Sequence, residues 1–220
     1  MTQALAAINY PNYSSPLILQ GVSWEMYEQL LETFAEYPNL RLTYYQETLE
    51  LMTPLPEHET YSWNLGRLIT VLSEELGLEI RGLKSTTWRS QAKGVGKEAD
   101  QCFYIQHEYL VRNKLKIDLQ NDPPPDLVIE IDLTNSSLSK FPIYAALKVP
   151  EIWIFQNKQL VLYHLSDNEY QEAEFSLAFP SFPVKKMTQF ILLDPQKGEN
   201  ARLKELRKWI TTQKLNRDQH

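Results

Sequence analysis

Two short strings of residues place carboxylates within or beside apolar, strand-like runs, and they constrain this chain more than any other feature. They are E-A-D at 98–100 and P-D-L-V-I-E-I-D at 125–132. A buried carboxylate costs free energy unless it is paired, hydrogen-bonded or bound to a metal ion. The strings lie about thirty residues apart. We therefore predict that neighbouring strands bring their acids to one site of the kind that holds a hard divalent cation.

Strand geometry separates the acids of the second string. A strand advances roughly 3.3 Å per residue and residues two apart share a face, so Asp126, Glu130 and Asp132 point the same way. Glu130 and Asp132 would be about 6.6 Å apart, whereas Asp126 and Glu130 would be about 13 Å apart, too far to share an ion directly. Glu130 is therefore the central candidate. Asp126 is expected at the strand entrance, where it would position a loop or, as an accessory site residue, a group next to the metal ligands.

Asp100 comes near the start of its own predicted strand. If that strand neighbours the one that carries Glu130, opposed residues are only about 5 Å apart across the ladder, and the two acids can hold one ion. The alternative is an ordinary structural role, in which Asp100 caps a turn and Glu130 pairs with a lysine or an arginine.

Hydrophobic periodicity predicts a mixed α/β pattern in which antiparallel hairpins feed a central sheet flanked by two helices. Helices are expected over 23–37, 57–76, 137–148 and 199–212. Strands are expected over 41–53 as a hairpin, 78–83, 85–91, 98–106, 126–133, 151–155 paired with 159–165, and 169–178.

The composition is that of an ordinary soluble globular protein, with 43% hydrophobic and 23% charged residues. No run approaches the roughly 18 apolar residues that a membrane helix needs, and the N-terminus lacks a signal pattern. The single cysteine, Cys102, excludes an internal disulfide and a thiolate zinc cluster. We expect a cytoplasmic protein without a membrane partner, built as an extended arm over 1–20, one domain over 21–212 and a flexible tail over 213–220.

The net charge of −6 argues against general coating of nucleic acid but leaves room for a locally basic face. Segment 81–97 carries five cations and no acid, among them Arg89, Lys93 and Lys97, with Trp88 interleaved. These three cations are candidates for binding a nucleic-acid backbone next to Asp100. A solvated hairpin explains the same pattern.

Several strings resemble the bacterial Uma2 family, once called DUF820. They are P-D-L-V-I-E-I, L-E-L-M-T-P-L-P-E-H, V-P-E-I-W-I-F, and Lys140 followed by Tyr144. The resemblance runs from about Ser23 to beyond Phe155 and implies a restriction-endonuclease-like fold of the PD-(D/E)XK superfamily. Such a fold has a mixed central sheet flanked by helices, to which this chain would add an N-terminal hairpin and C-terminal strands.

Carried over position by position, the resemblance implies that Asp100 and Glu130 are the metal-binding acids. Ala99 stands where the superfamily has proline, and Asp132 stands where it has lysine. Uma2 proteins carry their lysine in the following helix instead, which maps onto Lys140.

The first core helix supplies accessory candidates. In the superfamily an acid of this helix often lies near the metal, which suggests Glu57 or Glu59, and His58 stands at a position that is usually histidine in the family. Favourable interaction of the two acids with the helix dipole is the plainer interpretation.

These implications give the hypothesis of a Mg²⁺- or Mn²⁺-dependent endonuclease that hydrolyses DNA phosphodiester bonds. Asp100, Glu130 and the backbone carbonyl of Ile131 would hold the ion, while Lys140 would orient or help deprotonate the attacking water. The alternative is a catalytically degenerate nuclease fold that binds nucleic acid or protein, which Asp132 and the acidic net charge favour. A carboxylate-pair glycosidase would need its acids across an open cleft, which the strand placement disfavours. A homodimer is expected only by analogy with nucleases that cut two strands.

Overall fold

A computed structural model describes residues 16–37, 40–133, 139–180, 182–192, 194 and 196–217. Its α-helices are α1 (Trp24–Thr33), α2 (Pro56–Leu76), α3 (Glu108–Val111), α4 (Lys140–Leu147), α5 (Thr188–Ile191) and α6 (Glu199–Arg217), with 3₁₀ turns at Gln91–Lys93 and Val184–Met187. Its strands are β1 (Leu17–Gln20), β2 (Arg41–Tyr45), β3 (Thr48–Met52), β4 (Arg81–Gly82), β5 (Thr87–Ser90), β6 (Val95–Glu98), β7 (Gln101–Tyr104), β8 (Leu127–Asp132), β9 (Glu151–Gln156), β10 (Gln159–Ser166) and β11 (Glu169–Ala173). Over these residues, no helix has the length and apolar character that crossing a membrane requires.

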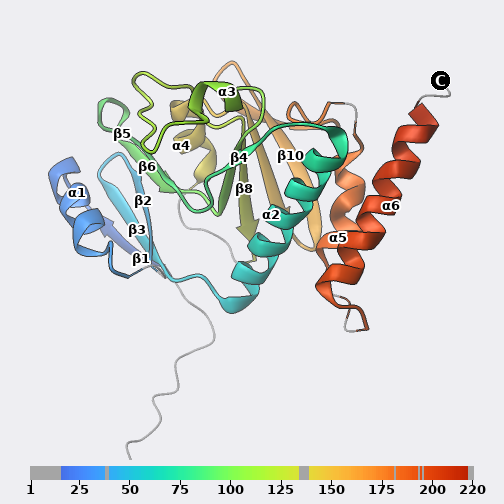
Figure 1. Ribbon diagram of the computed structural model, residues 1–220. Coiled ribbons are helices and arrows are strands. Elements are labelled where there is room, and N and C mark those ends of the chain that lie inside the picture. The colour runs from blue at the N-terminus through green and yellow to red at the C-terminus, as the bar shows by residue number, and fades with distance from the viewer. Residues whose placement is uncertain are drawn as a thin grey trace, which may run out of the picture.

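Two β-sheets form the frame of the molecule (Figure 1). The N-terminal sheet has the strand order β1-β3-β2-β6-β5, and the central sheet has the order β11-β10-β9-β8-β7-β4. Strands β8 and β9 run parallel and are joined through α4, as a parallel pair requires a crossover connection. The other pairings in the described part of the chain are antiparallel. The predicted mixed α/β class, with a helix-flanked central sheet and added N-terminal and C-terminal strands, is confirmed.

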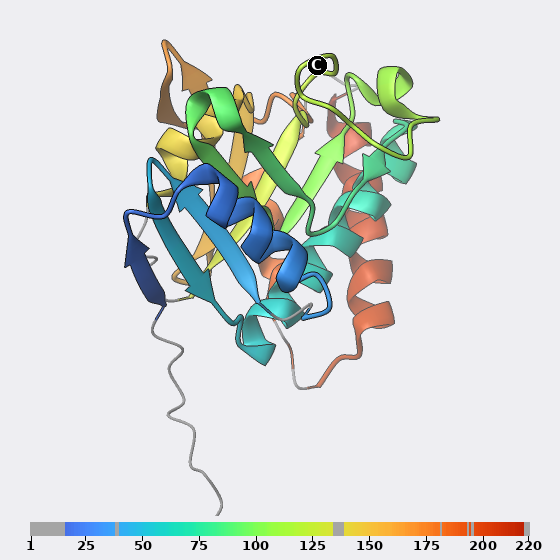
Figure 2. The same cartoon turned by 90° about the vertical axis from the view of Figure 1, so that its left-hand side faces the viewer.

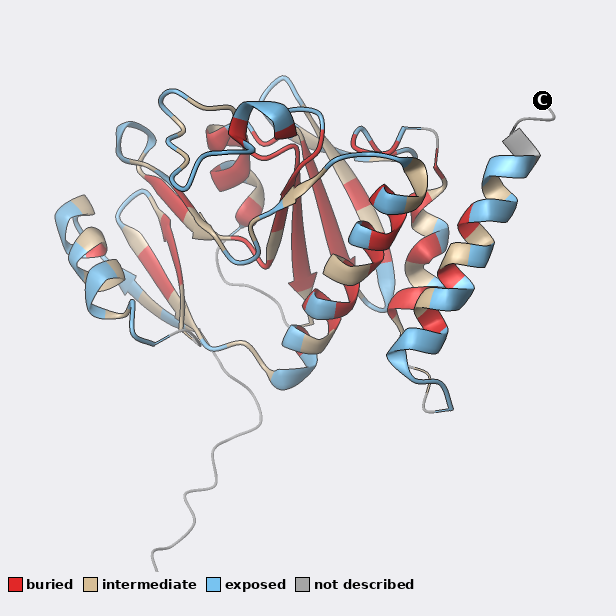
Figure 3. Cartoon of the chain, in the orientation of Figure 1, coloured by how far each residue is buried: buried red, intermediate tan, exposed pale blue. Residues whose placement is uncertain are grey.

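Strand β8 is buried along nearly its whole length (Figure 3). Its side chains alternate between two cores. Leu127, Ile129 and Ile131 belong to the core that α2, α5 and α6 cover. Val128 belongs to the other core, which contains the buried residues of α4. Glu130 therefore leaves β8 on the side of α4, because it is two residues from Val128.

The N-terminal sheet also packs on two faces. Its outer face carries α1 (Figure 2). There Tyr27 stacks on Tyr44 with ring centroids 4.7 Å apart. Its inner face contributes Trp88 and Val95 to the core that also contains α4 and β7 residues. Helix α4 is thus shared by the two sheets, and the space between them is where polar side chains from both can meet.

The chain crosses from one sheet to the other at the E-A-D string, which corrects the prediction of one strand over 98–106. Strand β6 ends at Glu98 in the N-terminal sheet, and β7 begins at Gln101 in the central sheet. Ala99 and Asp100 lie buried at the crossing. The strand stops there because β6 pairs with β2 and β5, whereas β7 pairs with β8 and β4.

Other boundaries differ from the predicted ones. The last four residues of the predicted arm form β1, which pairs with β3. The predicted strand over 169–178 ends at Ala173, and only Arg81 and Gly82 of 78–83 form a strand. The last helix runs past 212 to Arg217, and Lys214 there donates to the carbonyl of Glu75 at the end of α2.

Some predicted features lie outside the described residues. They are residues 1–15 of the arm, the start of the predicted helix over 137–148, and residues 218–220 of the tail. Helix α4 is described from Lys140, and its Pro142 lies in the first turn, where proline is tolerated.

Candidate active site

A narrow cleft of about 40 Å³ lies between the two sheets. Its walls are the inner face of the N-terminal sheet, the start of α2, the end of β8 and the start of α4. A volume of this size has room for only a few water molecules. Asp100, Glu130, Asp132, Lys140 and His58, all singled out in the sequence, line this cleft.

Asp100 is held by two donors from different elements. Its Oδ2 atom accepts a hydrogen bond from the backbone N–H of Ile131 at 2.7 Å and lies 3.1 Å from Nε2 of His58. Burial alone would raise the pKa of Asp100, but the hydrogen bond and charge of His58, the charge of Lys97 and the Ile131 N–H outweigh it, so that the pKa is lowered. Asp100 is therefore a carboxylate in the folded chain.

Glu130, at 3% exposure, is the most buried of the predicted acids. Its Oε2 atom lies 3.3 Å from Nζ of Lys97 and 3.4 Å from Nζ of Lys140. The hydroxyl of Tyr144 donates to Oε1. A strand of the N-terminal sheet and helix α4 thus place donors on this carboxylate of the central sheet, which offsets the cost of burying it.

Lys140 opens α4 and reaches two acids. In addition to Glu130, its Nζ atom contacts Oδ2 of Asp132 at 3.2 Å. Burial would lower the pKa of Lys140, but the charges of Glu130 and Asp132 outweigh it and raise the pKa. Lys140 is thus a cation in this arrangement, better suited to attracting a phosphate than to removing a proton from water.

His58 faces the cleft from the first turn of α2. Burial would lower its pKa, but the hydrogen bond and charge of Asp100, with weaker effects of Glu59 and Glu130, raise it. Its neighbour Glu57 is exposed and interacts with Tyr61 rather than with the cleft. The structure therefore brings His58 to the site and leaves Glu57 outside.

Of the three basic residues predicted to bind a substrate, one lies in the cleft and two lie outside it. Lys97 contacts Glu130 in the cleft. Arg89 and Lys93 are exposed beside a separate, larger hollow, where Arg89 lies 3.9 Å from Glu28 and Lys93 donates to the carbonyl of Ala146. Trp88 is buried in the core between the sheets, so it is not available to stack on a ligand.

Asp126 lies at the opposite end of β8 from Asp132, at the strand entrance. It accepts hydrogen bonds from the backbone N–H groups of Ile105 and His107, at 2.6 and 2.9 Å, and contacts the His107 ring. It therefore holds the loop after β7 and takes no part in the cleft.

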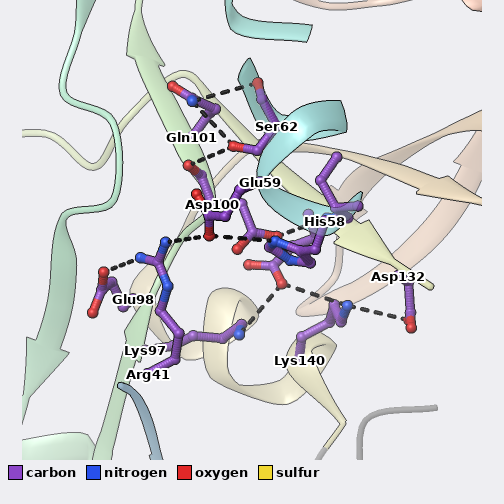
Figure 4. A network of polar contacts seen from close by, with 12 residues as sticks. Arg41, His58, Glu59, Ser62, Lys97, Glu98, Asp100, Gln101, Asp132 and Lys140 are labelled. Carbon is purple, nitrogen blue, oxygen red and sulfur yellow. Dashed lines mark hydrogen bonds and ion pairs between the residues drawn. The ribbon is translucent and has the colours of Figure 1, made fainter. Parts of the chain in front are cut away.

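Arg41 was not recognised from the sequence as a site residue. It projects from β2 into the cleft, where its guanidinium donates to Glu98 and, at 3.2 Å, to Glu59, and lies beside Asp100 (Figure 4). Glu50 of β3 also lines the cleft and is buried. The sequence shows that Arg41 and Glu50 are charged residues of a hairpin. It does not show which face of that hairpin meets the central sheet.

The charges of the described cleft residues favour a cation. Five acids and three permanent cations line it, with His58 in addition: Glu50, Glu98, Asp100, Glu130 and Asp132 against Arg41, Lys97 and Lys140. The net charge is −2 with neutral His58 and −1 with protonated His58.

The donor set suits a hard ion that keeps much of its water. Mg²⁺ typically takes one or two carboxylates and retains several waters, which matches Asp100 with Glu130. The N–H of Ile131 faces Asp100. Since the N–H and carbonyl of a strand residue point to the same side, this carbonyl could supply a third oxygen. No group of three or more His, Cys, Asp or Glu side chains in the described residues is arranged to hold a metal, so an all-side-chain cage of the zinc type does not fit.

Comparisons with known proteins identify the family of this chain. One solved structure found by comparison is titled a crystal structure of "a putative nuclease belonging to DUF820 from Anabaena variabilis"; it shares 15% identity, covers 82% of this chain and 98% of its own, and has a TM-score of 0.41. No curated protein matches the chain. The family model of Uma2, described as "Putative restriction endonuclease", matches residues 24–190. Since that match spans well over half of the sequence and includes every residue of the cleft, the chain belongs to the Uma2 family.

Proposed function

We propose that this chain is a Mg²⁺- or Mn²⁺-dependent endonuclease that hydrolyses phosphodiester bonds of DNA in the cleft between the two sheets. One observation carries the proposal: two buried carboxylates, Asp100 at the crossing between the sheets and Glu130 on β8, line one cleft with His58 and Lys140 in contact with them. The match of the chain to a family described as "Putative restriction endonuclease" supports the same function.

Each residue has a distinct part in this proposal. Asp100 and Glu130, with the carbonyl of Ile131, would hold the divalent ion, which polarises the phosphate and lowers the pKa of bound water. His58 hydrogen-bonds Asp100 and fixes the orientation of that carboxylate. Tyr144 does the same for Glu130.

Lys140 supplies positive charge next to the ion site. Phosphodiester hydrolysis builds negative charge on the phosphate oxygens, and a positioned cation stabilises that charge. Asp132 contacts Lys140 in this structure. The acid at the superfamily's lysine position is therefore compatible with catalysis, because it orients the lysine that comes from α4.

The test compares Glu130→Gln with Glu169→Gln, an exposed position on β11. We expect Glu130→Gln to lower Mg²⁺-dependent cleavage of plasmid and oligonucleotide DNA at least about a hundredfold, because the ion loses one of two anionic ligands. Glu169→Gln should cleave like the wild type, and thermal unfolding checks that both variants are folded. Cleavage by folded Glu130→Gln at the wild-type rate would refute the proposal.

A binding module without catalysis is the second candidate. The observation that favours it is that both carboxylates already have cationic partners within the chain and that the cleft is narrow. DNA binding by the wild type with no cleavage, and no change of stability at millimolar Mg²⁺ or Mn²⁺, would support the module over the enzyme.

A further inference from the structure

Two lysine ammonium groups share a single oxygen atom of Glu130. Lys97 lies 3.3 Å and Lys140 lies 3.4 Å from Oε2. The other oxygen, Oε1, accepts from Tyr144. Three donors thus surround Glu130, and a divalent ion bound to this carboxylate would lie next to both ammonium groups.

The two lysines are not held equally. Lys140 keeps a second carboxylate, Asp132, at 3.2 Å. For Lys97, Glu130 is the ion-pair partner among the described residues. The backbone of Lys97 is fixed in the middle of the N-terminal sheet by pairing of β6 with β2 and β5, but its side chain is a long flexible stem that can turn within the cleft.

We propose that Lys97 is a phosphate-binding residue whose availability depends on the metal: it neutralises Glu130 in the metal-free chain and turns to a substrate phosphate when a divalent ion takes that carboxylate. The inference rests on the proposed function and names the regulation of the same site. The physical reason is that a divalent ion at Glu130 removes the negative partner of Lys97 and repels its ammonium group. Lys140 stays beside the ion because Asp132 still holds it.

This arrangement couples metal binding to nucleic-acid binding. Without metal, Glu130 neutralises the charge of Lys97, so Lys97 contributes little attraction to a phosphate. With metal, the same charge becomes available to the substrate, so each ligand strengthens the binding of the other. Arg41 also lies beside Asp100, but it differs from Lys97 because its ion pairs are with Glu98 and Glu59, neither of which is a proposed metal ligand.

The first measurement uses the metal alone. Titration calorimetry with Mn²⁺ is carried out on the wild type, Lys97→Met and Lys204→Met, which makes the same charge change at an exposed position of α6. Lys97→Met should bind Mn²⁺ about three- to tenfold more tightly than the wild type, because the ion no longer competes with an ammonium group for Glu130. Lys204→Met should match the wild type. Equal or weaker Mn²⁺ binding by Lys97→Met would overturn the proposal.

The second measurement uses a fluorescent DNA oligonucleotide, with affinity determined in EDTA and in Ca²⁺ at constant ionic strength. The wild type and Lys204→Met should gain at least about fivefold in affinity with the ion, within the usual range of coupling between sites. Lys97→Met should lose most of that gain, and Lys97→Arg should restore it. Retention of the full gain by Lys97→Met would overturn the proposal.

Thermal unfolding of each variant verifies that it is folded, and Lys97→Gln, which also removes the charge, replaces Lys97→Met should that variant fail to fold. The pattern also separates this inference from the proposed catalysis. A wild type that shows the Lys97-dependent gain but never cleaves DNA would refute catalysis and keep the coupling. A wild type that cleaves while Lys97→Met matches it in both measurements would refute the coupling and keep catalysis.

Discussion

At the scale of single residues, Asp132 is the clearest departure from the superfamily pattern. It stands two residues after Glu130, where a lysine is expected, yet it contacts the lysine that α4 provides instead. The side chains of Asp132 and Lys140 are 23% and 11% exposed, so this ion pair is largely shielded from water. Asp132 helps to hold Lys140 in position, because Lys140 would otherwise have Glu130 as its one ion-pair partner in the described chain.

Asp132→Asn should therefore lower the cleavage rate roughly tenfold, the usual cost of losing a residue that orients a catalytic group. Its unfolding temperature should stay close to that of the wild type. Asp132→Glu, which keeps the charge, should recover part of the rate, and steady-state cleavage assays on the three proteins measure this. Failure of the glutamate variant to recover any rate, with both variants folded, would contradict a positional role.

At the scale of elements, the pattern of residues predicts strands better than it predicts their partners. The sequence correctly indicates the strand that carries Glu130 and the helices that carry His58 and Lys140. It does not indicate that the chain changes sheets at Asp100, because that depends on pairing with residues far away in the sequence, such as Thr43 for β6 and Val128 for β7. For the same reason Arg41 could not be assigned to the site, since its position depends on how the N-terminal sheet packs.

Strand β6 also depends on a close approach of α1. A methyl group added at Gly96 would lie 2.2 Å from the hydroxyl oxygen of Tyr27, which is fully buried and stacked on Tyr44. Gly96→Ala should therefore lower the free energy of unfolding by about 1–3 kcal/mol, the usual cost of overpacking. Denaturant unfolding measures this against Gly198→Ala, where the added methyl meets nothing within 4 Å. Equal stabilities of the two variants would show that α1 can move away without cost.

At the scale of the whole molecule, a buried acid outside the cleft fastens the chain after β11 to the central sheet. Glu151 of β9 is fully buried and accepts hydrogen bonds from Trp153 at 2.7 Å, from the backbone N–H of Ala178 at 2.8 Å and from Ser176 at 3.2 Å. His164 lies 3.8 Å away on β10. Burial raises the pKa of Glu151 despite these donors.

A raised pKa in the folded state means that the folded chain holds this proton more tightly than the unfolded chain. The stabilisation is therefore fully present below the ordinary pKa of glutamate, about 4.5, and is lost as pH rises through the raised pKa. Each tenfold difference in proton affinity is worth about 1.4 kcal/mol. Urea unfolding between pH 4 and 8 should show the wild type losing stability with rising pH relative to Glu151→Gln, whereas Glu169→Gln should follow the wild type. Parallel curves for wild type and Glu151→Gln would mean that Glu151 does not titrate in this range.

The crossing of the chain between the two sheets has a consequence for the order of folding. The contacts that enclose the cleft join segments far apart along the chain: Arg41 and Glu98 are 57 residues apart, and Asp100 and Ile131 are 31 residues apart. Contacts of such long range form late, because the loops between them must close first. A nascent or partly folded chain does not yet present the carboxylate pair in its working arrangement. An activity directed at DNA would thus be absent during synthesis. It would begin only when the N-terminal sheet has packed against the central sheet.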